Sequence, residues 1–329
     1  MAVVTEQQSP NLREPAGWRR TKNRIATILM YIAFVVVIIP LGFVLYTTIA
    51  KGISIISWQF LTSPIPPVVA AADEGGVGPA VLGTLEITAL ATVIAVPLGV
   101  LGAVYLNEYG GTGFLSRFIG FMADVMTGVP SIVMGLFIFS IWVLHFGFSG
   151  LAGAFALGCL MLPIVIRSTY EMLLLVPDAL REGSYALGAS KSRVTLTVVL
   201  PAAAGGIVSG CLLAVARAAG ETAPLLFTIL GGLSAANPNV FSGALLAIAR
   251  AAGETAPLLF TILTVTAPNP NPFNGPNTSI PSQIFVNATS AFTGAQDRAW
   301  GAALTLVVIA FVFMLAARFV TARFTRYSR

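Results

Sequence analysis

The chain has 329 residues, and only 9% of them are charged, against about 25% in an average soluble domain. Hydrophobic residues make up 56% of the chain and the mean hydropathy is +0.87, which excludes an intrinsically disordered protein and argues against a soluble enzyme. The single histidine, His145, excludes a cluster of histidine metal ligands, and the apolar surroundings of Cys159 and Cys211 predict buried thiols rather than a disulfide.

Apolar runs long enough to cross a membrane recur along the chain. A spanning helix needs about 20 apolar residues, and helices are favoured because the hydrocarbon core offers backbone groups no water partner. The first run follows a polar, basic segment, residues 1–24, and predicts a signal anchor whose N-terminus stays in the cytoplasm. The seven candidate runs are residues 25–49, 80–106, 118–144, 150–166, 202–230, 241–265 and 299–317.

The distribution of basic residues selects six spans with both termini in the cytoplasm. If the run at residues 241–265 is set aside, fourteen of the eighteen Lys and Arg residues face the cytoplasm. Lys51 and Arg298 face outward, and Arg217 and Arg250 lie in membrane runs. This asymmetry fits the positive-inside rule, whereas seven spans would place the basic tail, residues 321–329, outside. We therefore expect an all-α, multi-pass protein of a bacterial-type cell membrane, with its transmembrane domain over residues 25–320.

A polar stretch between the fourth and fifth spans, residues 167–201, carries the clearest motif. A glutamate is followed by two small residues, three further residues, a glycine, nine residues and then Val-Val-Leu-Pro. This pattern resembles the EAA loop of ABC importer permeases, with two small residues in place of the alanines and Val198 in place of an isoleucine. In chain order, the motif residues are Glu182, Gly183, Ser184, Gly188 and Pro201.

The same spacing has a physical interpretation. It predicts an amphipathic helix over residues 177–187 that exposes Leu180 and Leu187, a turn at Gly188, and a second helical segment that Pro201 stops. Two such helices can fit a groove on a cytosolic partner. The alternative is an ordinary cytoplasmic connection between spans.

Two opposite charges lie inside the fifth apolar run. A charged side chain at the bilayer centre costs about 2.5–3.5 kcal/mol on insertion scales, so such residues are functional candidates. Arg217 and Glu221 are four residues apart and can pair on one helix face. A guanidinium among small residues suits a narrow anion path and matches phosphate or sulfate geometry. The residues alone leave this path and a buried ion pair between helices equally open.

The string AVARAAGETAPLLF, residues 214–227, resembles the fifth helix of the PstA-type permeases of phosphate ABC importers, within the type I ABC importer permease family. The resemblance covers about residues 20–325. Sulfate and molybdate permeases share a similar Arg-x-x-Gly-Glu but differ after the glutamate. Four more stretches agree with the family: 103–109 (AVYLNEY), 124–135 (DVMTGVPSIVMG), 181–189 (REGSYALGA) and 299–306 (AWGAALTL).

The resemblance implies a fold of six spans and an assembly of several subunits. The implied partners are a second permease subunit (PstC-like), two ATPase subunits (PstB-like) and an extracytoplasmic phosphate-binding protein (PstS-like). The residues it implies for the transport path are Arg217 and Glu221, with Ser131 as a further candidate. The chain lacks the G-x-x-x-x-G-K-[ST] phosphate loop. We therefore expect a transport subunit rather than an enzyme, with no cofactor of its own and with Mg-ATP bound by the partner ATPase.

A near-perfect internal repeat interrupts this pattern. Residues 209–230 and 242–263 are identical at twenty of 22 positions, at an offset of 33 residues. The first copy follows the EAA-like loop at the expected distance, so we assign the fifth helix to it. The charges of the second copy, Arg250 and Glu254, are the alternative candidates for the transport path.

The leading hypothesis is the transmembrane permease subunit of an ATP-driven phosphate importer. Its first rival is an ABC permease for another oxyanion, such as sulfate or molybdate. The second rival is a stand-alone secondary transporter or channel, which would need no ATPase partner. Neither the composition nor any motif favours a nucleic-acid partner, because the basic ends are explained by membrane orientation and contact with anionic lipid.

Overall fold

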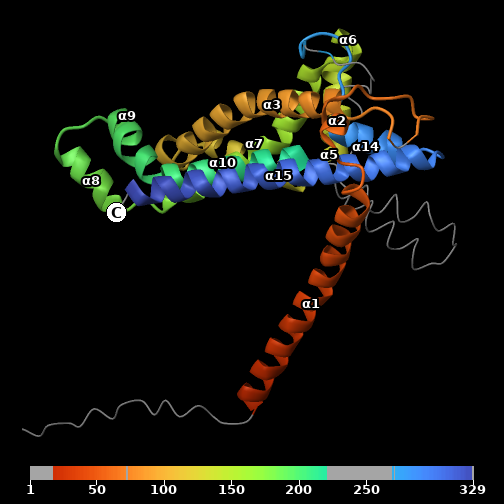
Figure 1. The fold of residues 1–329 in the computed structure, drawn as a ribbon. Helices are drawn as coiled ribbons and strands as arrows, with labels where there is room; N and C mark the ends of the chain where they lie inside the picture. Colours follow the sequence, from red (N-terminus) through yellow and green to blue (C-terminus); the bar gives the residue numbers. More distant parts are fainter. Residues whose placement is uncertain (1–17, 72, 221–268, 270, 328–329) are drawn as a thin grey trace, which may run out of the picture. The chain divides into compact units, whose positions relative to one another are not determined.

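The computed structural model is built from helices, and every regular element of the described residues is a helix (Figure 1). The described residues are 18–71, 73–220, 269 and 271–327. Among these described residues, five helices are long and apolar enough to cross a membrane, or six if one bent pair counts as a single span. The expectation of about six spans is therefore confirmed. Residues 221–230 of the first repeat copy and the whole second copy, residues 242–263, lie outside the described residues.

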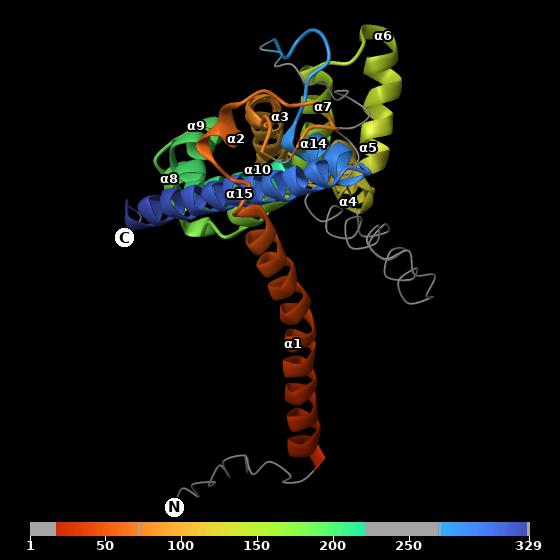
Figure 2. The same cartoon turned by 45° about the vertical axis from the view of Figure 1, so that its right-hand side comes forward.

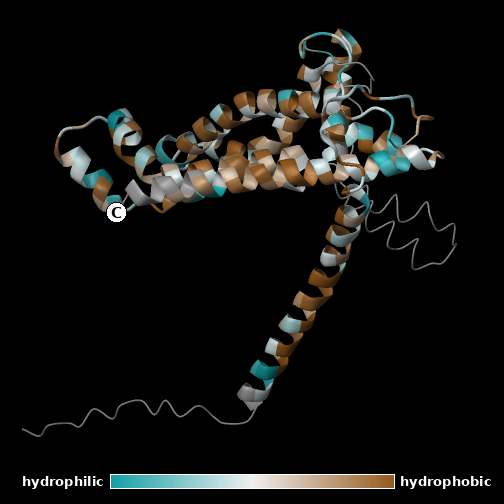
Figure 3. Ribbon diagram, viewed as in Figure 1, coloured by the Kyte–Doolittle hydropathy of each residue, from teal (hydrophilic) through white to brown (hydrophobic). Residues whose placement is uncertain are grey.

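The chain divides into two compact units, Met1–Thr47 and Thr48–Arg329. Helix α1, Trp18–Gly52, provides the regular structure of the first unit and contains the predicted span at residues 25–49. Most of its residues are apolar, as the hydropathy colouring in Figure 3 shows. Consecutive apolar residues from 28 to 32 have exposed side chains, so every face of the helix carries exposed apolar surface. A helix that is apolar all round suits a hydrocarbon environment.

Four long helices of the second unit lie side by side (Figures 1 and 2). Helix α7 packs against both α3 and α10, and α10 packs against α15. The core between α3, α7 and α10 consists mainly of alanine and medium-sized aliphatic side chains. The four helices are α3 (Gly78–Val104), α7 (Gly150–Leu174), α10 (Leu200–Gly220) and α15 (Thr293–Tyr327).

Small residues allow these helices to approach closely. A Cβ atom on Gly99 of α3 would lie 2.7 Å from a methyl carbon of Val165 on α7. A Cβ atom on Gly210 of α10 would lie 2.3 Å from the hydroxyl oxygen of Ser168 on α7. Small residues at helix contacts are typical of membrane bundles, where dispersion contacts replace the hydrophobic effect as the driving force.

The third predicted span, residues 118–144, is a broken helix rather than a continuous one (Figure 2). Its two halves meet at an angle of 114°. The break lies at Val129 and Pro130, because proline has no N–H to donate and pushes the residue before it into an extended conformation. The segments are α4 (Phe114–Gly128), α5 (Ser131–Ile138), the π-helix η2 (Phe139–Val143) and α6 (Leu144–Phe146).

At one end of the bundle, helix continues where the sequence predicted loop. Helix α7 extends through Arg167, the predicted start of the loop, and ends at Leu174. Pro201 does not stop the second segment, because it follows the π-helix η3. The backbone N–H of Leu200 donates to the carbonyl oxygen of Thr195, five residues earlier, so the turn before the proline is wider than an α turn. This wider turn accommodates a residue that lacks an N–H. The remaining elements here are η1 (Tyr105–Tyr109), α8 (Asp178–Ala186), α9 (Lys191–Val194) and η3 (Thr195–Val199).

At the opposite end, two short helices lie between the predicted spans (Figure 1). They are α2, Trp58–Thr62, and α14, Ile280–Ala288. Ser279 and Ser282 form a reciprocal capping box that starts α14, a serine variant of the usual Ser-x-x-Glu signal. The sequence does not predict either helix, because each is shorter than the window over which an amphipathic pattern can be recognised.

Arg298, near the start of α15, holds the proline-rich segment between α2 and α3. Its side chain is buried, although the sequence predicted only that it faces outward. Its guanidinium donates to the carbonyl oxygens of Ala70 (2.8 Å), Val68 (3.2 Å) and Pro67 (3.3 Å), and also to that of Ala71. One buried arginine thus binds four backbone acceptors of an irregular, partly exposed segment.

Candidate functional site

The predicted two-helix hairpin is present at one end of the bundle, where α8 leads through a turn into α9 (Figure 1). Leu180 and Leu187 are 46% and 90% exposed, so apolar surface faces away from the core. Gly188 has a φ of +78°, a left-handed conformation that favours glycine, as the turn was predicted to need. The hairpin therefore presents an apolar edge without a partner in the described part of this chain.

The small residues of α8 leave the helix backbone accessible on its outer face. A Cβ atom on Gly183 would meet nothing within 4 Å, and neighbouring Glu182 is exposed. The Ser184 hydroxyl donates to the carbonyl oxygen of Leu180 at 2.8 Å, so this side chain folds back on its own helix. Another protein can therefore approach the α8 backbone closely, as the two alanines of the motif would also allow.

Arg181 joins α8 to two other elements. Its guanidinium donates to the Glu108 carboxylate on η1, with Nη2 to Oε1 at 3.1 Å, and to Asp178 Oδ1 at 3.0 Å. It also donates to the carbonyl oxygens of Val176 (2.6 Å) and Leu173 (2.9 Å), at the C-terminal end of α7. A cation there is favourable because the last carbonyls of a helix lack partners within it.

The Glu108 carboxylate is buried although it is charged. Its side chain is 4% exposed, and Oε1 also accepts a hydrogen bond of 2.7 Å from the Asn107 amide. A second contact lies next to it, because the ammonium of Lys191 on α9 is 5.2 Å from the ring centre of Tyr109. Both helices of the hairpin therefore contact the same π turn at the end of α3.

The sequence alone does not pair Glu108 with Arg181. The stretches that contain them, residues 103–109 and 181–189, carry only a resemblance to the family. The available signal was topological: the predicted six spans place the end of the second span and the start of the loop on the same side of the membrane. Two opposite charges that flank apolar segments on one side are candidates for a pair, although 73 residues separate them.

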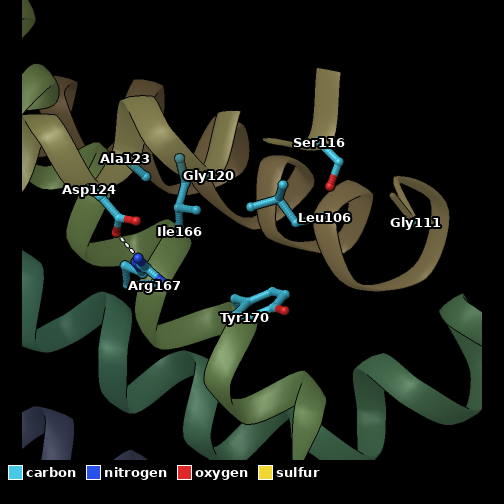
Figure 4. Close-up of a pocket in the computed structure, with 9 residues that line it drawn as sticks. All are labelled: Leu106, Gly111, Ser116, Gly120, Ala123, Asp124, Ile166, Arg167 and Tyr170. Carbon is cyan, nitrogen blue, oxygen red and sulfur yellow. Dashed lines mark ion pairs between the residues drawn. The ribbon is translucent and has the colours of Figure 1, made fainter. Parts of the chain in front are cut away.

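A cleft of roughly 190 Å³ lies beside this region, between η1, α4 and α7 (Figure 4). Asp124 of α4 and Arg167 of α7 point toward one another across it and form an ion pair. Both side chains are about half exposed, which limits the stabilising effect of the pair. The other residues that line the cleft are Leu106, Gly111, Ser116, Gly120, Ala123, Ile166 and Tyr170.

The predicted transport-path residues are only partly within the described residues. Arg217 lies in the last turn of α10 with an exposed side chain, between buried alanines. Its predicted partner Glu221 and the second-copy candidates, Arg250 and Glu254, lie outside the described residues. Ser131 is fully buried at the first position of α5, and its hydroxyl has no hydrogen-bond partner. The assignment of these residues to a path stays a prediction.

Neither cysteine forms a disulfide, since Cys159 and Cys211 are both free thiols. Cys211 is buried in the core between the long helices, and Cys159 packs against a smaller apolar cluster. In the described part of the chain, no three side chains of His, Cys, Asp or Glu gather into a metal-binding group.

Comparison with known proteins gives matches along most of the chain. Residues 95–237 match the family model described as the binding-protein-dependent transport system inner membrane component. The phosphate transport system permease protein PstA 1 of Mycobacterium tuberculosis (strain H37Rv) is 42% identical over 311 residues, which cover 93% of this chain and 90% of that protein. The phosphate transport system permease protein PstA of Yersinia pestis is 45% identical over 66% of this chain and 74% of its own length.

Among solved structures, a chain of the MetNI methionine ABC transporter in an inward-facing conformation matches with a TM-score of 0.48 and 17% identity. The match covers 77% of this chain and 94% of the other. The family model, the relatives and the apolar helices agree that this chain is an all-α, multi-pass membrane permease of the ABC importer class.

Proposed function

The chain belongs to the PstA family of phosphate transport permeases, and from this premise we propose that it is the transmembrane permease subunit of an ATP-driven importer of inorganic phosphate. Relatives that match more than nine-tenths of the chain are named for phosphate transport. The structural observation that carries the proposal is the hairpin of α8 and α9, which exposes two leucines and leaves the outer backbone of α8 accessible. It supplies the docking element that such a subunit needs for a separate ATPase.

In the proposed assembly, the chain forms the path together with a second permease subunit. Two ATPase subunits bind and hydrolyse Mg-ATP, and an extracytoplasmic phosphate-binding protein delivers the substrate. The chain itself carries out no covalent chemistry and holds no cofactor. Its membrane is a bacterial-type cell membrane, with both termini in the cytoplasm, as the distribution of basic residues favours.

The mechanism follows from the hairpin and the bundle. When the ATPase subunits close on ATP, they displace α8, and the long helices alternate access to a site near the middle of the membrane. Arg217 and Glu221 are the proposed charges of that site, since a guanidinium offers two parallel donors to a phosphate. Ser131 is a further candidate, because a buried hydroxyl without a partner retains the capacity to bind a polar ligand.

Phosphate uptake tests this proposal in cells that lack their own importer and express the partner subunits. The unmutated chain should restore uptake, and sulfate and molybdate should compete weakly. Arg217→Gln should abolish uptake, whereas Arg250→Gln should leave most of it. Loss with Arg250→Gln alone would preserve the function but move the path to the second repeat copy. If the unmutated chain restores uptake of another oxyanion instead, the phosphate assignment is wrong.

A further inference from the structure

We propose that Glu108 and Arg181 form the junction through which movement of α8 is transmitted to α3 and α7. This inference rests on the proposed function and adds two positioning residues to it. Neither residue would touch the transported anion. Their role would be to make the hairpin and the ends of two spans move as one body when an ATPase displaces α8.

The hydrogen bonds of Arg181 identify the three elements that meet. Nη2 reaches both Glu108 on η1, at 3.1 Å, and the Leu173 carbonyl of α7, at 2.9 Å. Nη1 reaches the Val176 carbonyl, just beyond α7, at 2.6 Å. A guanidinium is planar and holds its donors in a rigid fork, so these partners cannot shift independently. Lysine would keep the charge but would lose this geometry.

The two carboxylates that pair with Arg181 differ in how deeply they are buried. The side chain of Glu108 is 4% exposed, whereas that of Asp178, which also pairs with Arg181, is 87% exposed. Water can replace Arg181 at the exposed carboxylate but not at the buried one. The pair of Glu108 and Arg181 therefore stays closed, while the pair with Asp178 opens at little cost.

The backbone around Glu108 also indicates a special arrangement. Glu108 lies in the π turn η1, which is closed by a hydrogen bond of 2.6 Å from Gly110 N to the carbonyl oxygen of Tyr105. Single π turns are rare within helices and are frequent at functional sites, because they reposition side chains by an inserted residue. Tyr109 in the same turn contacts Lys191 of α9. The hairpin is thus attached to α3 through both of its helices.

A purely structural role predicts a different outcome from a transmitting one. If the pair only holds the loop folded, its loss lowers the amount of assembled complex but leaves the coupling of each complex intact. If the pair transmits movement, assembled complexes still hydrolyse ATP but transport less anion for each ATP. The ratio of anion transported to ATP hydrolysed therefore distinguishes the two roles.

The experiment uses the complete purified complex in lipid vesicles, with the binding protein and inorganic phosphate on the outer side. Glu108→Gln keeps the shape of the side chain and removes the charge, and Arg181→Lys keeps the charge and removes the fork. We expect both variants to lower the phosphate-to-ATP ratio by about tenfold or more, since each loses hydrogen bonds to a charged group. The matched control, Asp178→Asn, should stay within about twofold, because it removes only an exposed pair.

An unchanged ratio in Glu108→Gln or Arg181→Lys would overturn the proposal. Failure of both variants to assemble with the ATPase subunits would overturn it as well, because the junction would then serve folding rather than transmission. A failure of the proposed function is distinguishable. If the unmutated complex transports another oxyanion, the phosphate assignment is wrong, and the ratio of anion transported to ATP hydrolysed is then measured with that anion. An unmutated complex that moves no anion at all would contradict the proposed function before any variant is compared.

Discussion

An arginine lies at each end of the bundle in the second unit, and the two arginines are used differently. Arg181, at the hairpin end, binds a carboxylate and two carbonyls and joins three helical elements. Arg298, at the opposite end, binds four carbonyls of one irregular segment. The first arginine connects parts that belong to different helices, whereas the second holds a loop in place.

The surroundings of the two arginines differ in the same sense. Arg298 is 1% exposed, whereas the side chain of Arg181 is 14% exposed and lies on α8, which also carries the exposed Leu180. The buried guanidinium of Arg298 donates to four carbonyl oxygens of one segment at once, which restricts the movement of that segment. The hairpin end keeps an apolar edge available to a partner. We infer that Arg298 is a static clamp, which holds its segment in place, and that the hairpin of α8 and α9 is a moving joint, which shifts with a partner.

The strongest test of this comparison removes the static clamp. Arg298→Met should lower the free energy of unfolding by about 1.5–3 kcal/mol, because four carbonyl oxygens of this segment lose a charged donor. Thermal unfolding of the purified protein in detergent measures this change. Proteolysis should also become faster in residues 64–77, the segment between α2 and α3, where Arg298 binds.

Arg318→Gln is the matched control for this experiment. Arg318 lies on the same helix, α15, but its side chain is exposed. Its replacement should change the free energy of unfolding by less than about 0.5 kcal/mol, as is usual for surface positions. A comparable loss of stability in both variants would mean that Arg298 is not a special clamp.

The sequence predicted the hairpin end better than the opposite end, for a physical reason. The turn at Gly188 and the exposed Leu180 and Leu187 follow from local spacing, because helix periodicity and glycine conformation depend on near neighbours. Arg298 was predicted only to face outward, since its carbonyl partners lie more than 220 residues away in the chain. Contacts to backbone carbonyls leave no signature in the residue types of the partners.

Two errors in the predicted spans have the same origin. The continuous hydropathy of residues 118–144 predicts one helix, because hydropathy does not register the backbone break at Pro130. The error at Pro201 is the opposite one, since the proline predicts the end of a helix that continues after a π turn. The effect of a proline depends on the hydrogen bonds of the preceding turn, and residue type alone does not specify them. The pair of Glu108 and Arg181 was missed because only the packed helices bring it together.

A smaller effect is expected at the turn of the moving joint. Gly188→Val places a branched side chain at a φ of +78°, which should cost about 1–2 kcal/mol in the folded state. The turn between α8 and α9 should distort, and binding of the ATPase subunits should weaken in a pull-down of the assembled complex. Gly183→Ala is the control, because a Cβ atom there meets open space within a helix. Equal retention of the ATPase by both variants would contradict a specific requirement at the turn.

The smallest effect is expected from the second attachment of the hairpin. Lys191→Gln removes the cation above Tyr109, a contact worth about 0.5–1 kcal/mol at exposed sites. Because the buried pair of Glu108 and Arg181 remains, thermal stability should fall only slightly and phosphate uptake should persist. Combined with Arg181→Lys, the same change should lower the logarithm of the uptake rate by more than the sum of the two single effects, since the hairpin would then lose both links to η1. Purely additive effects of the two substitutions on the logarithm of the uptake rate would show that the two contacts act independently, and α8 and α9 would then have to be treated as separate attachments rather than as one joint.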